Sequence, residues 1–250
     1  MNSSIQKAFK ILSFVAANPQ KMSLSEMSTA LSMNKTTLFR FLQTLESLNL
    51  LDKKNGSYVP GIRLFELGSK VPVKQLIVGK AHPLLVKLTE KVNETVNLGE
   101  LNNHKILYLD KFESNRSLQI QTNIGSYISL HCTALGKAAL SILPEFERKG
   151  IISRLVLEKR TKNTISDLQK LVTYIEEVKK RGYSLDIEEW EVGLHCVAVP
   201  LAIPELNFYG AISFAGPSVR FTWARMAELA DQLKETVTRI KKAISLGGDE

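Results

Sequence analysis

The chain has 250 residues, of which 44% are hydrophobic and 23% are charged. This composition supports a packed core and excludes a disordered chain, and the length suits two ordinary domains or one large one. No apolar run reaches the roughly 20 residues that cross a bilayer, and the first 20 residues lack the continuous apolar stretch of a signal peptide. With only two cysteines, we expect a cytoplasmic protein without a disulfide framework or a membrane partner.

The formal net charge of +8 is unevenly distributed along the chain. Residues 1–70 carry nine Lys and Arg against four Asp and Glu, whereas the other 180 residues carry 24 against 21. A basic segment of this size beside a nearly neutral one is typical of a polyanion-binding module joined to a second domain.

Three short helical patterns follow one another in the basic segment. The first covers residues 4–18, and the second covers residues 23–31 and begins with a capping box of Ser23 and Glu26. After a tight break, a third helix is predicted over residues 35–48. The expected inward positions include Ile5 of the first helix and Leu38, Phe41, Leu42, Leu45 and Leu48 of the third.

The outward face of the third helix is rich in hydrogen-bond donors. Short hydroxyls and long basic or amide side chains on one face suit phosphate oxygens and base edges in a DNA major groove. A short helix, a tight turn and a donor-faced second helix predict a helix-turn-helix. The predicted DNA contacts are Lys35, Thr36, Thr37, Arg40 and Gln43 on this helix, and Ser25 on the helix before it.

A β-hairpin is predicted directly after the third helix, in the sequence "LLDKKNGSYVP". Asn55-Gly56 favours the positive φ angles of a type I′ turn, and Lys53 and Lys54 lie beside that turn. A basic hairpin in this position indicates the wing of a winged helix-turn-helix. A three-helix bundle with a solvated hairpin is the alternative, but charge, turn chemistry and element order together favour DNA binding.

Residues 61–80 contain Gly61, Gly68, Pro72 and Gly79 among apolar residues, a pattern typical of interrupted helices that join two domains. The apolar side chains here are expected to serve packing, in part across a dimer. Helix-turn-helix proteins commonly bind DNA as symmetric dimers. The residues concerned are Leu64, Phe65 and Leu67.

The pattern changes from residue 94 onward, where strand-length apolar segments alternate with turn signals. We predict an α+β domain in which helices pack on an antiparallel sheet. The expected strands cover residues 95–101, 105–112, 117–123, 183–193, 195–203 and 208–216, and the expected helices cover 133–143, 145–157, 167–181 with Leu168 inward, and a last helix capped by Thr222.

Four stretches of the sequence together resemble the IclR (isocitrate lyase regulator) family of bacterial transcriptional regulators. They are "YVPGIRLFELG", "LHCTALGKAAL", "RGYSLDIEEWEVGLHCVAVPL" and "GAISFAGP". The resemblance implies a winged helix-turn-helix domain over residues 1–60, a linker helix over 61–80 and a GAF-like effector domain over 81–250. It also implies a pseudo-palindromic DNA operator, a homodimer or dimer of dimers, and a small metabolite effector, often a carboxylate. No cofactor or catalytic site is expected.

The tripeptide "LHC" occurs at residues 130–132 and 194–196 and holds both cysteines. Adjacent side chains in a strand point to opposite faces, so neither copy would direct both His and Cys toward one metal ion. A zinc-binding variant of the regulator remains an alternative. A small-molecule enzyme fused to the DNA-binding module would need a hydrogen-bonded Cys/His pair, which this spacing does not favour. The cysteines can also be buried free thiols that pack as small hydrophobes.

A cap before the helix at residue 134 predicts an anion site. Thr133 stands at the capping position, and the small residues that follow leave the first backbone N–H groups accessible. A carboxylate would bind the N–H groups of Ala134, Leu135 and Gly136. By resemblance, this is where the family holds the acid group of its effector.

The resemblance places the rest of the effector pocket on the sheet. Asp186 is expected to point inward and accept a hydrogen bond from a ligand hydroxyl, so that a hydroxy- or keto-acid derived from a sugar satisfies both ends. Glu188, Glu189 and Glu191 are expected on a solvated edge. Ala215 stands where some relatives have a second hydroxyl. The expected wall consists of Ile120, Ile128, Asp186, Leu194, Cys196 and Ser213.

Overall fold

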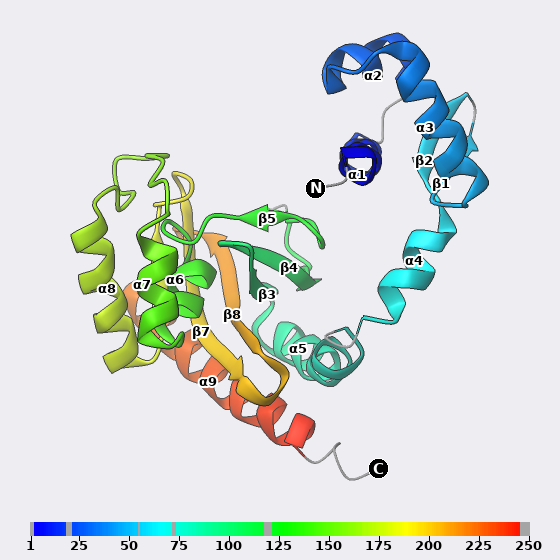
Figure 1. Cartoon of the computed structure of the whole chain (residues 1–250). Coiled ribbons are helices and arrows are strands. Elements are labelled where there is room, and N and C mark those ends of the chain that lie inside the picture. The colour runs from blue at the N-terminus through cyan, green and yellow to red at the C-terminus, as the bar shows by residue number, and fades with distance from the viewer. Residues whose placement is uncertain (1–2, 19–21, 55, 72–73, 118–121, 246–250) are drawn as a thin grey trace. The chain divides into compact units, whose positions relative to one another are not determined.

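The computed structural model describes residues 3–18, 22–54, 56–71, 74–117 and 122–245 (Figure 1). The chain divides into two compact units, Met1–Val71 and Pro72–Glu250. The first is mainly helical, and the second combines an antiparallel sheet with helices, so the fold is the predicted α+β type with an N-terminal winged helix-turn-helix.

The first unit has its apolar core where three helices meet a two-stranded hairpin. Ile11, Leu38 and Leu42 are fully buried in this core. The elements are α1 (Ser3–Ala17), α2 (Leu24–Leu31), α3 (Lys35–Ser47), β1 (Leu51–Lys54), β2 (Ser57–Pro60) and α4 (Ile62–Ser69). The antiparallel hairpin β1–β2 lies where the sequence predicts it, although Asn55 of its predicted turn is outside the described residues.

Side-chain caps fix the first turns of α2 and α3. The capping box is confirmed, because the Glu26 amide donates to Ser23 Oγ at 3.3 Å and the Ser23 amide donates to Glu26 Oε2 at 2.7 Å. The Asn34 side chain accepts from the Thr36 amide at 2.9 Å. Between the helices, Ser32 takes a left-handed conformation with φ of 53°. The Asn34 cap therefore holds the first turn of α3, as the Ser23–Glu26 box holds the first turn of α2.

Three apolar residues lie on the surface instead of facing inward. Ile5, Leu48 and Leu168 are 57%, 54% and 43% exposed. Ile5 and Leu168 lie in the first turns of α1 and α8, and Leu48 is the C-cap of α3. The helical period assigns a side chain to a face, but it does not show where the covering element ends.

The second unit is built on a six-stranded antiparallel sheet with strand order β5-β4-β3-β8-β7-β6. Two predicted elements are shorter in the structure: the helix from residue 145 ends at Ile152, and the strand expected over 183–193 covers only four residues. The strands are β3 (Thr95–Asn102), β4 (Lys105–Phe112), β5 (Tyr127–Ile128), β6 (Ser184–Ile187), β7 (Leu194–Ile203) and β8 (Phe208–Pro217).

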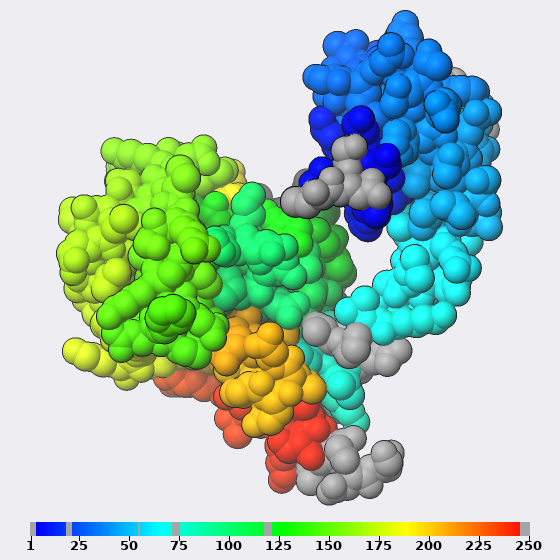
Figure 2. All heavy atoms as spheres, in the orientation of Figure 1, coloured from blue at the N-terminus to red at the C-terminus, as the bar shows by residue number. Residues whose placement is uncertain are grey.

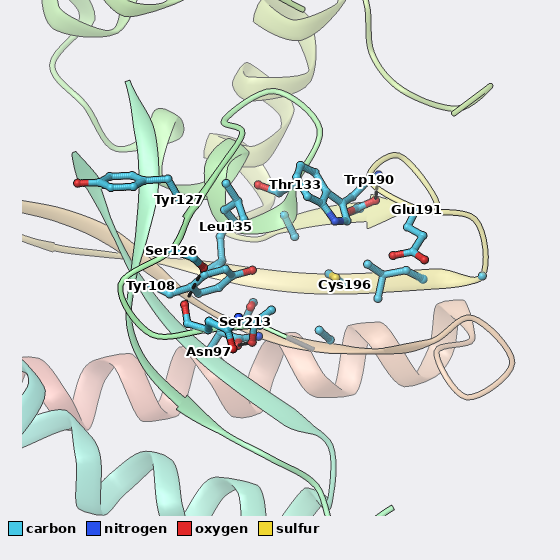
Figure 3. Close-up of a pocket in the computed structure, with 18 of the residues that line it drawn as sticks. Asn97, Tyr108, Ser126, Tyr127, Thr133, Leu135, Trp190, Glu191, Cys196 and Ser213 are labelled. Carbon is cyan, nitrogen blue, oxygen red and sulfur yellow. Dashed lines mark hydrogen bonds between the residues drawn. The ribbon is translucent and has the colours of Figure 1, made fainter. Parts of the chain in front are cut away.

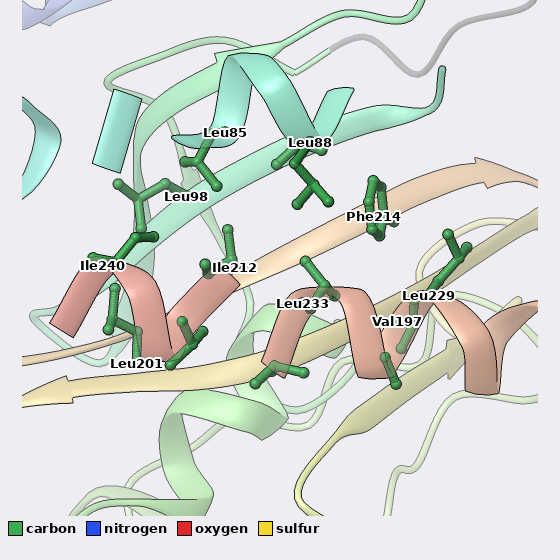
Figure 4. Packing of buried hydrophobic residues seen from close by; sticks show 14 of the residues in the cluster. Leu85, Leu88, Leu98, Val197, Leu201, Ile212, Phe214, Leu229, Leu233 and Ile240 are labelled. Carbon is green, nitrogen blue, oxygen red and sulfur yellow. The ribbon is translucent and has the colours of Figure 1, made fainter. Parts of the chain in front are cut away.

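Helices cover both faces of this sheet. On one face, α5 (Gly79–Val92) and α9 (Trp223–Ser245) bury large apolar side chains against the strands, among them Leu85, Leu233 and Phe214 (Figure 4). On the other face lies α6 (Ala134–Ser141), which packs on the strands and on α8 (Leu168–Arg181). The helix α7 (Glu145–Ile152) and α8 are visible at the surface in Figure 2. A short π-helix, Lys74–Val78, precedes α5, and a 3₁₀ turn, Pro204–Leu206, joins β7 to β8.

The strand register places small and polar residues together on the α6 face. Asp186 pairs with Cys196, which in turn pairs with Ala215. One step along the sheet, Ser213 pairs with Asn97. Large apolar residues fill the opposite face, whereas small and polar residues on the α6 face line a cavity beside the apolar cluster there. None of the described helices is long and apolar enough to cross a membrane.

Candidate functional site

A cavity of about 600 Å³ lies between the α6 face of the sheet and the N-terminal end of α6 (Figure 3). Thr133 and Leu135 lie on its helix side, and Cys196, Ser213 and Asn97 lie on its sheet side. This volume suits a small metabolite. The lining residues are Asn97, Tyr108, Thr122, Asn123, Ser126, Tyr127, Ile128, Thr133, Ala134, Leu135, Asp186, Trp190, Glu191, Val192, Gly193, Leu194, Cys196, Ser213, Ala215 and Pro217.

The N-terminus of α6 supplies backbone donors at the cavity wall. Thr133 is the N-cap, and its Oγ1 accepts from the Gly136 amide at 3.1 Å while donating to the Ser129 carbonyl at 2.7 Å. The amides of Ala134 and Leu135 have no intrahelical acceptor, because the helix starts there. They carry the positive end of the helix dipole, so this wall attracts a negatively charged oxygen.

Gly136 serves close packing and does not line the cavity. A Cβ at this position would lie 2.4 Å from the Leu130 backbone. Its amide is already bonded to Thr133. Of the three amides predicted to bind an anion, those of Ala134 and Leu135 therefore belong to cavity-lining residues, and that of Gly136 does not.

A polar cluster occupies the sheet side of the cavity. Asn97 is 1% exposed, and its Oδ1 accepts from Thr122 Oγ1 at 2.9 Å. Ser213 lies beside it as its cross-strand partner and is 2% exposed. Both residues line the cavity, so an amide and a hydroxyl are available there for polar groups of a bound molecule.

Asp186 is the buried acid of the cavity and is 1% exposed. Its Oδ1 accepts from the amides of Glu189 at 2.7 Å and Trp190 at 3.3 Å. Its Oδ2 is buried and has no hydrogen-bond partner in the described part of the chain. Burial raises the pKa of this carboxyl to about 7, against the opposing effect of the nearby Lys137 ammonium.

Lys137 and Glu189 form a buried ion pair beside this acid. Lys137 is fully buried, and its ammonium lies 4.5 Å from the centre of the Tyr174 ring. The expectation that Glu189 is solvated is wrong, since it is 6% exposed. The reason is the buried ammonium on α6, which needs a counter-ion that residue spacing alone does not identify.

The loop between β6 and β7 forms a further wall. Trp190 is held there by Arg160, whose guanidinium carbon lies 3.6 Å from the ring centre and whose Nε donates to the Trp190 carbonyl at 3.2 Å. Glu191 and Asp186 carry the carboxyl groups among the described lining residues, which include no Lys, Arg or His. A bound anion would therefore depend on the α6 amides for its positive partner.

The two LHC tripeptides have different surroundings. The first lies in irregular backbone before α6 and not in a strand, and its His131 Nε2 lies 3.0 Å from the Glu158 carbonyl oxygen. In the second, on β7, Leu194 and Cys196 line the cavity while His195 Nδ1 lies 3.0 Å from the Phe221 carbonyl oxygen. The strand alternation predicted for the second copy is confirmed.

Both cysteines are free thiols in the structure. Burial raises the pKa of Cys132 to about 11 and the pKa of Cys196 well above its ordinary value. A protonated thiol is a poor nucleophile. Within the described ranges, no group of three or more His, Cys, Asp or Glu is arranged to hold a metal ion.

The structure brings most of the predicted effector residues together at this cavity. Gly136 is the exception described above, and Ile120 lies outside the described residues. The cavity is also lined by Asn97, Tyr108 and Trp190, which were not predicted from the sequence. A signal existed for Asn97, because it is a polar residue inside the apolar strand "TVNLGEL". The predicted residues that line the cavity are Ile128, Thr133, Ala134, Leu135, Asp186, Leu194, Cys196 and Ser213.

In the first unit, the donor face of α3 is open to solvent. Lys35, Thr36, Arg40 and Gln43 are exposed, and Thr37 is half-buried. The other predicted contacts, Ser25 on α2 and Lys53 and Lys54 on β1, are also exposed. This arrangement leaves the reading helix and the wing available to DNA.

A helix-turn-helix with a free donor face, joined to a domain with a metabolite-sized cavity, defines a ligand-responsive DNA-binding regulator. Residues 4–54 match the IclR helix-turn-helix domain, and residues 70–242 match the C-terminal domain of the bacterial transcriptional regulator IclR. The chain belongs to the IclR family. It is a transcriptional regulator with a DNA-binding domain and an effector domain.

Relatives and solved structures agree with this assignment. The chain is 33% identical to the transcriptional regulator KdgR of Dickeya chrysanthemi over 90% of this chain and 73% of that protein. It is 31% identical to the crystal structure of Thermotoga maritima IclR, with a TM-score of 0.77 and coverage of 98% and 99%. An IclR homolog from Microbacterium hydrocarbonoxydans, complexed with 4-hydroxybenzoate, has the same fold at 17% identity, with a TM-score of 0.86 and coverage of 97% and 99%. The curated relative is named as a regulator, which confirms the expectation of a non-enzyme.

Replacing Asp186 by Asn tests the buried acid in the ligand-free protein. A carboxyl whose pKa is higher in the folded protein than in the unfolded chain binds its proton more tightly when folded. The wild type therefore loses stability as the pH rises from about 4 to about 7. We expect Asp186→Asn to raise Tm relative to wild type, with a larger gain at pH 8 than at pH 5, in paired thermal melts. An equal difference in Tm between the variant and the wild type at both pH values would contradict a raised pKa of Asp186 in the folded protein.

Proposed function

We propose that the effector of this regulator is a small carboxylate bearing hydroxyl or keto groups, such as a sugar acid, and that it binds in the α6 cavity. The observation that carries the proposal is that one cavity is lined on one side by Ala134 and Leu135, whose amides lack an intrahelical acceptor, and on another by Asp186, whose buried Oδ2 has no hydrogen-bond partner among the described residues. The amides suit the acid group. Asn97 and Ser213 suit hydroxyl or keto groups at the other side.

The ligand of a solved neighbour supports the same chemical class. The IclR homolog from Microbacterium hydrocarbonoxydans was crystallised with 4-hydroxybenzoate, which is a hydroxy-substituted carboxylate. The present cavity includes the aromatic side chains of Tyr108, Tyr127 and Trp190. An aromatic hydroxy-acid is therefore the second candidate, although the polar cluster on the sheet side favours a ligand with several polar groups.

On the DNA side, we propose that α3 enters the major groove and that the hairpin contacts the backbone beside it. The exposed donors of α3 and the lysines of β1 support this placement. The operator would be pseudo-palindromic, read by a homodimer or a dimer of dimers in the cytoplasm. Exposed apolar residues on α4 support self-association: Ile62, Phe65 and Leu67 are 70%, 64% and 51% exposed.

We propose regulation by population shift. An effector bound at residues 133–137 would favour one packing of the effector domains in the assembly, and residues 61–80 would transmit this to the spacing of the two reading helices. The effector shifts the equilibrium only if it binds one arrangement more tightly than the other. Either release or promotion of DNA binding would satisfy this mechanism.

Lys35→Ala and Arg40→Ala test the reading helix. Each should weaken operator binding by about 1 kcal/mol or more, and loss of a phosphate contact should also reduce the salt slope by about one. Fluorescence anisotropy at several salt concentrations measures both effects. Lys159→Ala, an exposed lysine of the effector domain, is the control and should leave affinity unchanged. Full affinity in both α3 variants would refute this placement of the helix.

A thermal-shift panel tests the ligand class. The panel contains D-gluconate, D-glucuronate and 2-keto-D-gluconate, with D-glucitol as the uncharged counterpart. At least one acid should raise Tm, whereas D-glucitol should not, because the α6 amides favour a negative charge. Stabilisation only by uncharged aromatic compounds would contradict the proposal. Cys196→Ser should change the response to an active acid while leaving DNA binding without ligand intact, since Cys196 lines the cavity.

A further inference from the structure

The cavity presents an electrostatic conflict to any acid that enters it. Asp186 and Glu191 line it, and no Lys or Arg belongs to its described lining. A negatively charged ligand would therefore meet an acidic wall. The α6 amides provide the positive partner for one ligand group only.

The groups that face Asp186 leave it without a free cation. On α6, the Lys137 ammonium is engaged by Glu189, which itself adds a negative charge near Asp186. From β7, β4 and the segment before α6, Cys196, Tyr108 and Cys132 face it; burial raises the pKa of each, so they carry protons at neutral pH. These groups therefore supply no positive charge to offset the repulsion between Asp186 and a bound anion.

The two oxygens of Asp186 have different roles. Oδ1 accepts two backbone amides and is fixed by them. Oδ2 is buried without a partner among the described residues and belongs to a side chain that lines the cavity. A proton on Oδ2 would remove the charge and turn this oxygen into a donor without disturbing the bonds to Oδ1.

We propose that the effector binds together with one proton, which resides on Oδ2 of Asp186 and is donated in a hydrogen bond to an effector oxygen. The inference rests on the proposed function, because it assumes an anionic effector in this cavity. It revises the role expected from the sequence, in which the same residue accepts a bond from a ligand hydroxyl. The proton comes from the buffer acid: its bond to the buffer breaks as an O–H bond forms on Oδ2, and no other covalent bond changes.

Proton linkage gives a measurable pH dependence. Burial places the pKa of the Asp186 carboxyl in the ligand-free protein at about 7, so the protonated fraction of Asp186 falls about tenfold between pH 6 and pH 8. Because the effector binds the form of the protein in which Asp186 is protonated, its Kd should rise by about the same factor over this pH range. The sugar acids themselves stay ionised throughout, so their own titration does not contribute.

Isothermal titration calorimetry of the full chain with D-gluconate, D-glucuronate and 2-keto-D-gluconate tests the inference. Titrations at pH 8 in phosphate and in Tris, which differ in ionisation enthalpy, give the number of protons taken up. We expect close to one proton per acid bound for wild type and none for Asp186→Asn. The Asn amide imitates the neutral acid, so this variant should bind at pH 8 about as tightly as wild type does at pH 6. Glu191→Gln, which alters the other lining carboxylate, should keep the uptake.

The outcomes separate this inference from the proposed function. Binding without proton uptake, with a Kd that stays constant from pH 6 to pH 8, would overturn the inference and leave the carboxylate effector standing. Uptake that persists in Asp186→Asn would assign the proton elsewhere and would also overturn it. Failure of all three acids to bind at either pH would contradict the proposed ligand class, and the inference with it.

Discussion

The close packing of α6 against the irregular segment that precedes it is the constraint on which the candidate effector site depends. Gly136 allows the helix to approach the Leu130 backbone, where a Cβ would lie 2.4 Å away. The eight residues of α6 are all buried, and Thr133, Ala134 and Leu135 at its N-terminus line the cavity. In this buried setting, two amides without an intrahelical acceptor and a helix dipole interact more strongly with an anion than they would at an exposed surface.

Burying this helix brings charges inside that must be balanced. Lys137 enters the core with α6 and is neutralised by Glu189 in the loop after β6. That loop also carries Trp190, whose amide, like that of Glu189, is bonded to Asp186. The cavity wall, the buried ion pair and the acid are thus parts of one hydrogen-bonded unit, and a ligand that contacts Asp186 acts on all of it. This coupling provides a route by which occupancy could change the packing of the domain.

Much of the architecture could be predicted from the sequence because it depends on local patterns. The capping box, the hairpin and the strand alternation at Cys196 follow from residue types a few positions apart, and the structure contains each of them. Contacts between residues far apart in the sequence were harder to predict. Glu189 is buried because of a lysine 52 positions away, and Asn97 joins Ser213 through strand register that the sequence does not encode locally. Ile5, Leu48 and Leu168 were misplaced because periodicity does not locate the edge of a packed surface.

The central claim is that the N-terminus of α6 holds the acid group of the effector, and Ala134→Pro tests it most directly. Ala134 is the first helical residue, where proline is tolerated and removes only an N–H that the helix does not use. Leu168→Pro makes the same change at the first residue of α8, after a cap with similar backbone angles and outside the cavity lining. In thermal-shift assays with D-gluconate, D-glucuronate and 2-keto-D-gluconate, the account predicts that Ala134→Pro loses the stabilisation by an active acid while Leu168→Pro keeps it. Undiminished stabilisation of a folded Ala134→Pro variant would contradict the account.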